Sequence, residues 1–432
     1  MIVAMCLLTS HIGRIFEKVL VGFHIPAVLC SIAIVAAVLG RTIVTFKTRI
    51  GSVFGATVFW LAVTALLSIY HRGSAEYLVS YLFFWVMLFL IISCAPRNFV
   101  DLKKLFYTTA FACFLNLVLA QRGGKGRLGL VGTFGNADDV ALMAGFAIPL
   151  WIFCITQMKN RLLQIAVGGL GLIYLLRTVA LTATRSALLG LACMFLIYLV
   201  RSGPVTRIFL IIVTVVAAAI FATVLPQRII DRFKTISEAL DDQDAAEIRS
   251  SEAIASIAER RDLIRDAINM TVHHPLFGIG PGQFGFYRFE HFKDARGKPK
   301  RYFPAHNTYL QISSEQGLLG LVLYLTLLFQ VYRSTRKFVA KNKRFPEDEL
   351  GSQMALCMEA ALIFFAFCAF FMNCDKHPYI FVLGGFCVAY ERLFAFYRAH
   401  TPAAADAPQT ASLPIGTQKS RYPNPLMAAR NR

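Results

Sequence analysis

The sequence predicts an all-α polytopic membrane protein with about twelve transmembrane helices and one large, mainly helical loop outside the membrane. Hydrophobic residues make up 56% of the 432 residues and charged residues only 16%, whereas soluble domains carry about 25% charged residues. Apolar runs recur along most of the chain, each close to the roughly 20 residues needed to cross a hydrocarbon core of about 30 Å. Such runs must be helical, because only a helix pairs its own backbone polar groups within lipid.

The expected elements divide the chain into four parts. Nine membrane helices occupy residues 1–225, a hydrophilic loop with an amphipathic helix follows at 226–305, and three more membrane helices lie within 306–397. Residues 398–432 are rich in Pro, Ala and Ser with scattered positive charge, a composition that predicts disorder. The first apolar run is short and could lie in the membrane interface instead. The runs cover residues 1–12, 22–39, 53–70, 77–94, 103–120, 134–156, 162–181, 186–200, 206–225, 307–332, 352–373 and 378–397.

Lys and Arg concentrate in alternate short loops, and this asymmetry sets the orientation. These loops hold, in order, Arg41, Lys47 and Arg49; Arg97, Lys103 and Lys104; Lys159 and Arg161; Arg201 and Arg207; and a cluster from Arg333 to Arg344. All fall on one side when twelve segments are counted, so the positive-inside rule makes that side, with both termini, cytoplasmic. The net charge of +19 is therefore a topology signal and does not indicate nucleic-acid binding.

The opposite, outer side carries the long loop 226–305, in which thirteen basic and twelve acidic residues nearly cancel. Long loops are translocated largely regardless of charge, so this loop is compatible with the topology. The same side holds Gln121 to Thr133, where Arg122, Lys125 and Arg127 lie among five glycines. Three cations in a short outer loop oppose the positive-inside rule. Either the assignment of membrane segments is different at this loop, or its charges have a function. We favour a function.

A cluster of polar residues begins at His306, where the outer loop runs into the tenth expected membrane helix. His306, Asn307, Gln311 and Glu315 place polar groups at the mouth of an apolar helix. Such groups are costly unless satisfied, so a binding or catalytic role is the default interpretation. The alternative is interfacial capping, in which Asn307 or Thr308 caps the helix and His306 lies at the membrane surface.

Arginines gather on the same outer side. Arg185 opens the eighth apolar run at its outer end, and Arg260 and Arg265 lie in the long loop. An arginine at the depth of Arg185 requires a partner, and its planar fork suits phosphate oxygens. The structural alternatives are an interfacial anchor for Arg185 and a solvated ion pair of Arg260 with Glu259 or Asp262.

A basic segment laced with aromatic residues runs from Arg288 to Arg301, just before His306. It suits an anionic lipid or glycan, although a solvated surface loop explains it equally well. Arg72 and Arg127 also face outward and are further candidates for the same electrostatic surface.

The chain carries none of the common nucleotide or metal motifs. The adjacent acidic pairs Asp138-Asp139 and Asp241-Asp242 are not placed like a metal-binding Asp-x-Asp, and the first pair is expected to begin a helix, where the dipole favours negative charge. No P-loop motif and no Cys-x-x-Cys spacing is present. We therefore expect no ATP, nucleotide sugar, metal or other cofactor.

The stretch from His306 to Gly320 resembles the outer-loop signature of the O-antigen ligase and polymerase superfamily, which are GT-C-type membrane glycosyltransferases. His306, Asn307, Gly317 and Gly320 occupy the four defined positions of that signature. Three further stretches resemble family segments, so that the resemblance spans most of residues 130–330. The sequence departs from the family at Ile264, where many members carry an aromatic residue, and in the N-terminal third. These stretches are Arg260 to Gly285, with its Pro-Leu-x-Gly-x-Gly turn, Gly132 to Ala141 and Thr182 to Gly190.

This resemblance implies an inverting glycosyltransferase of the bacterial inner membrane. Such an enzyme moves a glycan from undecaprenyl diphosphate to an acceptor hydroxyl on the periplasmic side, in contact with membrane lipids. It implies that Arg185 and Arg260 clamp the diphosphate and that His306 is the general base, or alternatively donates to a phosphate oxygen. Gln311 and Glu315 would orient His306 or line the acceptor site.

Several functions remain open. We favour an O-antigen ligase with lipid A core as acceptor, because the His-Asn signature is complete. A polysaccharide polymerase, whose acceptor is another lipid-linked glycan, and a protein O-oligosaccharyltransferase share the same donor. A transporter, from a different class, is disfavoured because the halves of the chain show no repeat and the polar residues gather at the outer edge.

Overall fold

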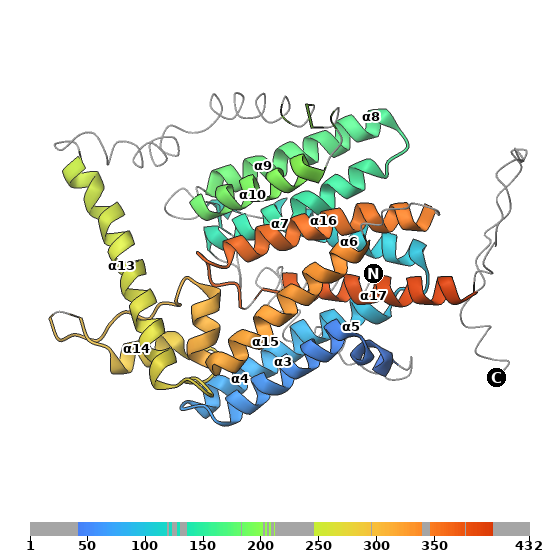
Figure 1. Ribbon diagram of the computed structural model, residues 1–432. Coiled ribbons are helices and arrows are strands. Elements are labelled where there is room, and N and C mark those ends of the chain that lie inside the picture. The colour runs from blue at the N-terminus through green and yellow to red at the C-terminus, as the bar shows by residue number, and fades with distance from the viewer. Residues whose placement is uncertain are drawn as a thin grey trace, which may run out of the picture.

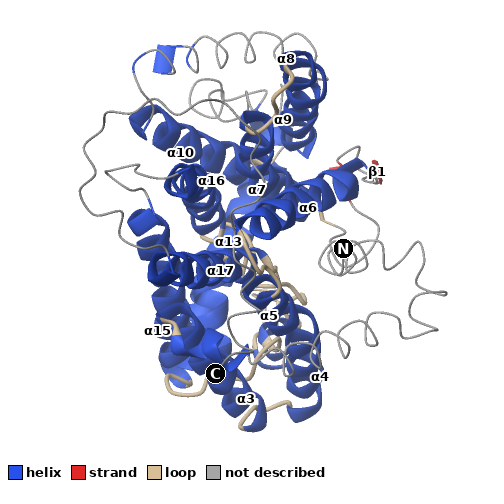
Figure 2. Cartoon of the chain, turned by 90° about the vertical axis from the view of Figure 1, so that its right-hand side faces the viewer, coloured by secondary structure: helices blue, strands red, loops and turns tan. Residues whose placement is uncertain are grey.

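The computed structural model describes a helical protein. It covers residues 42–118, 121–122, 128–129, 136–182, 184–201, 204, 207–208, 211, 246–294, 296–338, 346–375 and 377–400. Within these residues the only strands are β1 (Gln121–Arg122) and β2 (Leu128–Gly129), which pair antiparallel beside α6 (Figure 2). The expected helices at 1–12 and 22–39, nearly all of 206–225, Arg127 and most of the tail 398–432 lie outside the described part.

The helices follow the predicted apolar runs wherever the chain is described (Figure 1). They are η2 (Thr42–Lys47), α3 (Arg49–Leu66), α4 (His71–Tyr81), η3 (Leu82–Val86), α5 (Met87–Cys94), α6 (Phe99–Val118), α7 (Ala137–Thr156), α8 (Arg161–Leu163), η4 (Gln164–Gly169), α9 (Leu170–Thr182), α10 (Arg185–Arg201), α13 (Ala246–His273), α14 (Phe284–His291), α15 (Thr308–Phe338), α16 (Pro346–Cys368) and α17 (Tyr379–His400).

Six helices of the described part are long and apolar enough to cross a membrane. The other runs predicted there, at 77–94, 103–120 and 186–200, are helical as well. A total of about twelve membrane helices remains a prediction. The six are Arg49–Leu66, Ala137–Thr156, Arg161–Thr182, Thr308–Phe338, Glu349–Cys368 and Tyr379–Tyr397.

Aromatic side chains fill the core of the helix bundle. Helix α7 packs against α6, α9 and α16, while α15 packs against α3 and α16. Phe106 and Phe153 lie edge to face, with ring centroids 4.8 Å apart, and both are fully buried. Large apolar side chains such as Phe59, Leu162 and Leu170 instead lie exposed on the outside. An apolar exterior around a packed core is what lipid as solvent requires.

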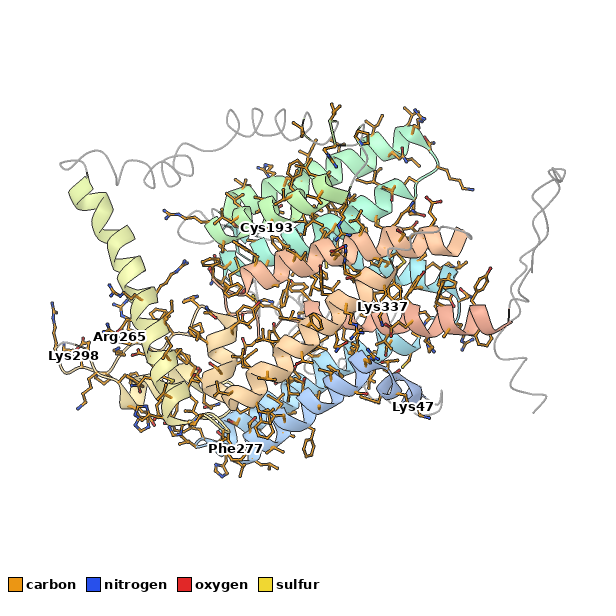
Figure 3. The ribbon with its side chains drawn as sticks, viewed as in Figure 1. Lys47, Cys193, Arg265, Phe277, Lys298 and Lys337 are labelled. Atoms are coloured by element: carbon orange, nitrogen blue, oxygen red, sulfur yellow. The ribbon has the colours of Figure 1, made fainter. Side chains whose placement is uncertain are left out.

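The described part of the long loop, residues 246–305, packs at one end of the bundle (Figure 1). Leu263, Ala267 and Met270 of α13 form a small core of their own with Ile279 and other residues of the segment. The exposed Arg265 and Lys298 lie at this end of the molecule, whereas Lys47 and Lys337 lie toward the other (Figure 3). The two ends are therefore built from different charged loops, as the alternation of Lys and Arg along the sequence predicts.

Helix α15 is broken at Gly317, where the sequence predicts a continuous membrane helix over 307–332. Gly317 has φ +71° and ψ −179°, which divides α15 into a short helix at 308–316 and a longer one at 318–338. The second part alone is about 30 Å long at 1.5 Å per residue, enough to cross the hydrocarbon core. The first part is thus a separate half-helix beneath the loop.

The turn at 275–280 fills the hydrogen-bonding positions that the break leaves open. Ile279 N donates to Ser314 O at 3.0 Å and Gly280 N to Glu315 O at 2.9 Å. In the other direction, Leu318 N donates to Pro275 O at 2.8 Å. Buried backbone groups need partners, so the turn and the break require each other.

We predict that Gly317→Ala strongly destabilises the protein. A Cβ at this position would lie 2.0 Å from Leu276 O, a backbone atom, and the left-handed conformation adds strain. The matched control is Gly297→Ala, because Gly297 has φ +75° but no atom within 4 Å of the added Cβ. The control should show only the conformational cost of about 1–2 kcal/mol. Thermal unfolding in detergent measures both, and equal midpoints for the two variants would contradict the role of the break.

Candidate functional site

His306 lies at the junction between the loop and α15, in an unusual backbone conformation. It is the only non-glycine residue of the described part with positive φ, at +51°. Asn307 Oδ1 accepts from Leu310 N at 3.1 Å and so caps α15, as the capping alternative predicts. Thr308 Oγ1 donates to Met372 O at 2.8 Å. The neighbours of His306 thus fix its position, and the left-handed conformation marks a site where local strain is maintained by its surroundings.

Charges from two helices, α7 and α13, act on the half-buried imidazole. Burial lowers the pKa of His306 below the ordinary value for histidine, and the positive charge of Arg260 lowers it further. The carboxylates of Asp138, Glu259 and Asp139 act in the opposite direction. The imidazole is therefore neutral near pH 7, the form that accepts a proton.

The acidic pair Asp138-Asp139 connects the surroundings of His306 to Arg185. Thr184 Oγ1 donates to Asp138 Oδ1 at 2.9 Å. Asp138 lies in the first turn of α7 and Arg185 is the first residue of α10, with an exposed side chain. Arg185 therefore follows directly after the residue that pairs with Asp138, whereas Arg260 of α13 is linked to this region by its electrostatic effect on His306.

The connection between α16 and α17 contacts both the acidic pair and the start of α15. His377 Nε2 lies 3.2 Å from Asp139 Oδ1, and Cys374 N donates to Thr308 Oγ1 at 2.7 Å. Tyr77 Oη donates to Asp375 Oδ2 at 3.0 Å. The other oxygen, Asp375 Oδ1, is buried and has no hydrogen-bond partner among the described residues. A buried acceptor of this kind suits a water or a hydroxyl donor from a ligand.

Glu315 and Gln311 contact the protein backbone. Glu315 Oε2 accepts from Gly282 N at 2.7 Å, while its Oε1 accepts from Phe284 N at 3.0 Å and from Gln311 Nε2 at 2.5 Å. Gln311 Oε1 accepts from Ala305 N at 2.8 Å. The buried Glu315 carboxylate therefore holds the start of α14, where the helix dipole favours negative charge. The geometry gives both residues a structural role; their predicted role in substrate binding remains untested.

Arg288 is buried in a charge network inside the loop. Its Nε donates to Asp266 Oδ2 at 2.8 Å and its second guanidinium nitrogen to Asp262 Oδ2 at 3.0 Å. Lys300 Nζ bridges the same two carboxylates, at 2.7 Å from Asp262 and 2.9 Å from Asp266. Burial alone would raise the pKa of Asp262, but Lys300 and Arg288 hold it below its ordinary value. Arg288 thus joins α13 to α14, so the geometry gives it a structural role.

The remaining predicted cations lie on the surface. Arg265 and Arg301 are exposed, and the carbonyl of Arg301 accepts from Arg288 at 2.8 Å. Arg72 is 94% exposed and pairs with Glu76 at 3.2 Å, within the same turn of α4. No contact between these residues and His306 is described, so their predicted role in substrate binding remains a prediction.

Sequence reasoning missed several polar residues of the site. Asp138 and Asp139 were assigned only to helix initiation, although they also face His306 electrostatically. Asp375 and His377 were not singled out, because they lie in a short connection without a recognisable spacing. Their signal in the sequence is the polar stretch from Asn373 to His377 between two long apolar runs.

The fold and the site define a helical membrane protein with a polar centre of histidine, arginine and carboxylate side chains at one end of its bundle. Residues 170–325 match the family model described as O-antigen ligase. The matched residues include His306, Asn307, Gly317 and Gly320, so the match confirms the resemblance that these residues carry. No curated protein shows significant similarity to the chain.

We predict that Glu315→Gln loosens the start of α14 without unfolding the bundle. A glutamine offers one acceptor oxygen in place of two, so Gly282 N or Phe284 N would face an amide donor. Hydrogen–deuterium exchange of these amides should accelerate about 10- to 100-fold. Glu76→Gln, at an exposed carboxylate, is the control and should leave exchange unchanged. Unaltered protection in Glu315→Gln would contradict the role assigned to this carboxylate.

Proposed function

We propose that the protein is an inverting glycosyltransferase that moves a glycan from undecaprenyl diphosphate to an acceptor hydroxyl at the periplasmic face of the inner membrane. The family match supports a function of the ligase or polymerase type. The observation that carries the proposal is the half-buried His306, whose pKa is lowered by burial and by Arg260 and raised by the carboxylates of Asp138 and Asp139. A neutral base under the influence of a cation supports transfer from a diphosphate, which requires both.

The proposed reaction is a single displacement at the anomeric carbon. The acceptor oxygen attacks that carbon while His306 takes the hydroxyl proton, so the imidazole becomes imidazolium. The bond from the anomeric carbon to the diphosphate oxygen breaks, and the diphosphate leaves with the electron pair. Attack from the opposite face inverts the configuration. Because the donor is already activated, the reaction requires neither ATP nor a metal ion.

Arg185 and Arg260 are proposed to stabilise the leaving diphosphate. Its negative charge grows as the bond breaks, and a guanidinium can bind two phosphate oxygens together. Both side chains are exposed at the end of the bundle that carries the loop, so a ligand can reach them. Asp375, with its buried unpaired oxygen, is proposed to accept a hydrogen bond from a sugar hydroxyl.

The acceptor decides between the remaining functions. We favour ligation onto lipid A core, with polymerisation onto a second lipid-linked glycan as the alternative; transfer to a protein hydroxyl would use the same site. A transporter would require a path between the two faces. The polar residues of the site instead belong to one end of the bundle, which favours surface chemistry.

We predict that His306→Ala abolishes glycan transfer while the protein still inserts in the membrane. The measurement is the glycan profile of a strain lacking the gene, complemented with wild type or variant. Long chains left on the carrier, with none on lipid A core, would identify a ligase; accumulation of single repeat units would identify a polymerase. His273→Ala, at an exposed histidine of α13, is the control and should restore wild-type glycan. An unchanged profile in the deletion strain would reject the enzyme and favour the transporter.

A second prediction concerns pH. Because burial and Arg260 lower the pKa of His306, kcat/KM should fall only below the ordinary histidine value of 6.5. Removing the cation favours imidazolium, so Arg260→Gln should move this acidic limb to higher pH, whatever its effect on the maximal rate. Arg261→Gln removes an adjacent exposed charge and should leave the limb in place. A rate that instead rises on acidification would identify His306 as a proton donor to phosphate and reject the base.

A further inference from the structure

A second polar cavity lies at the end of the bundle away from the loop, between α3, α15 and α17. Its volume is about 320 Å³. Arg49 lines it from the start of α3, and Arg333 and Lys337 line it from the last turns of α15. Lys337 lies toward the same end as Lys47, opposite Arg265 and Lys298 (Figure 3). This cavity is therefore separate from the site around His306.

The cavity has an excess of positive charge. Three cations line it against one carboxylate, Glu391 of α17. Glu391 Oε1 accepts from Ser334 Oγ at 2.8 Å. Among the residues that the structure describes, no ion pair involves Arg49, Arg333 or Lys337. Three cations from α3 and α15 thus line one cavity with a single carboxylate opposite them. This excess of positive charge favours an anionic ligand.

The start of α3 adds to this field. The Thr48 side chain accepts from Gly51 N at 3.1 Å and so marks Arg49 as the first residue of the helix. The positive end of the α3 dipole therefore lies beside the cavity. Backbone N–H groups and the dipole at a helix start favour phosphate-like ligands. The helix start therefore adds to the positive electrostatic potential that the three side chains produce in the cavity.

The rest of the lining is apolar. Ile50 of α3, Phe338 of α15 and Phe394 of α17 line the cavity beside the cations. Phe338 packs against Tyr390, with ring centroids 4.2 Å apart, so this wall is held in place. A free phosphate ion has no apolar portion that could pack against these side chains. A phospholipid presents a phosphate and an adjoining apolar portion together, and basic pockets between membrane helices bind such headgroups.

We propose that this cavity binds the headgroup of an anionic phospholipid from the leaflet at the end of the bundle away from the loop. The phosphate lies among Arg49, Arg333 and Lys337, and the glycerol and first acyl carbons lie against Ile50, Phe338 and Phe394. The lipid then joins α3, α15 and α17 at the far end of the helix that begins beneath the loop. This inference does not depend on the function proposed above.

The test is binding of phosphatidylglycerol to the full-length protein in uncharged detergent, followed by native mass spectrometry. Each cation near a phosphate contributes roughly fivefold in affinity, so Arg333→Gln/Lys337→Gln should bind about 25-fold more weakly than wild type. The control removes two exposed cations that do not line the cavity, Lys104 of α6 and Lys159 after α7, as Lys104→Gln/Lys159→Gln, and should bind like wild type. Equal loss in both variants would mean general surface attraction and would overturn the site.

Two further measurements distinguish the ligand source and guard against misfolding. Glu391→Gln removes the opposing charge and should bind phosphatidylglycerol about fivefold more tightly, a gain that an unfolded variant cannot produce. Phosphatidylcholine, which has no net charge, should bind more weakly than phosphatidylglycerol. Displacement of the lipid by millimolar inorganic phosphate would overturn the lipid in favour of a soluble phosphate compound. Unchanged binding in Glu391→Gln would also count against the site.

Discussion

The break of α15 at Gly317 is the constraint on which the rest of the outer site depends. A helix interrupted near the membrane surface exposes carbonyl and N–H groups that lipid cannot satisfy. The turn at 275–280 pairs with Ser314, Glu315 and Leu318, so the loop is locked to the helix by backbone hydrogen bonds. Because both partners are backbone, this connection specifies geometry and leaves the side chains available for chemistry.

The charged residues of the loop divide into two groups. Arg288, Lys300, Asp262 and Asp266 neutralise one another, and Glu315 neutralises the start of α14. Buried charges that neutralise one another fix the conformation of the loop, and we assign them a structural role and not a chemical one. Arg260, which acts on the pKa of His306, and Arg185 differ from these residues because their side chains are exposed. A ligand with negative charge can therefore bind to the second group without breaking the first.

Helix α15 joins the two ends of the bundle. Its first half begins beside His306, and its last turns carry Arg333 and Lys337 beside the basic cavity. Between them, 318–338 packs against α3 and α16 within an aromatic core. Close packing makes residues 318–338 a rigid unit, and the break at Gly317 connects this unit to the half-helix that begins beside His306.

The sequence by itself determined the class of the protein and its helices, and it predicted His306 as the central residue of the candidate site. Apolar length and the requirement for paired backbone groups define membrane helices locally, and the His306 signature and the match of residues 170–325 agree. Only the tertiary structure decided which polar residues meet. It placed Asp138 and Asp139 where they act on His306, paired Asp139 with His377, and buried Arg288 and Glu315 in structural contacts. The reason is that hydropathy and spacing report on single segments, whereas these contacts join residues far apart in the chain. The break at Gly317 was hidden for the same reason, because a glycine in an apolar run becomes a break only when another segment supplies the missing hydrogen bonds.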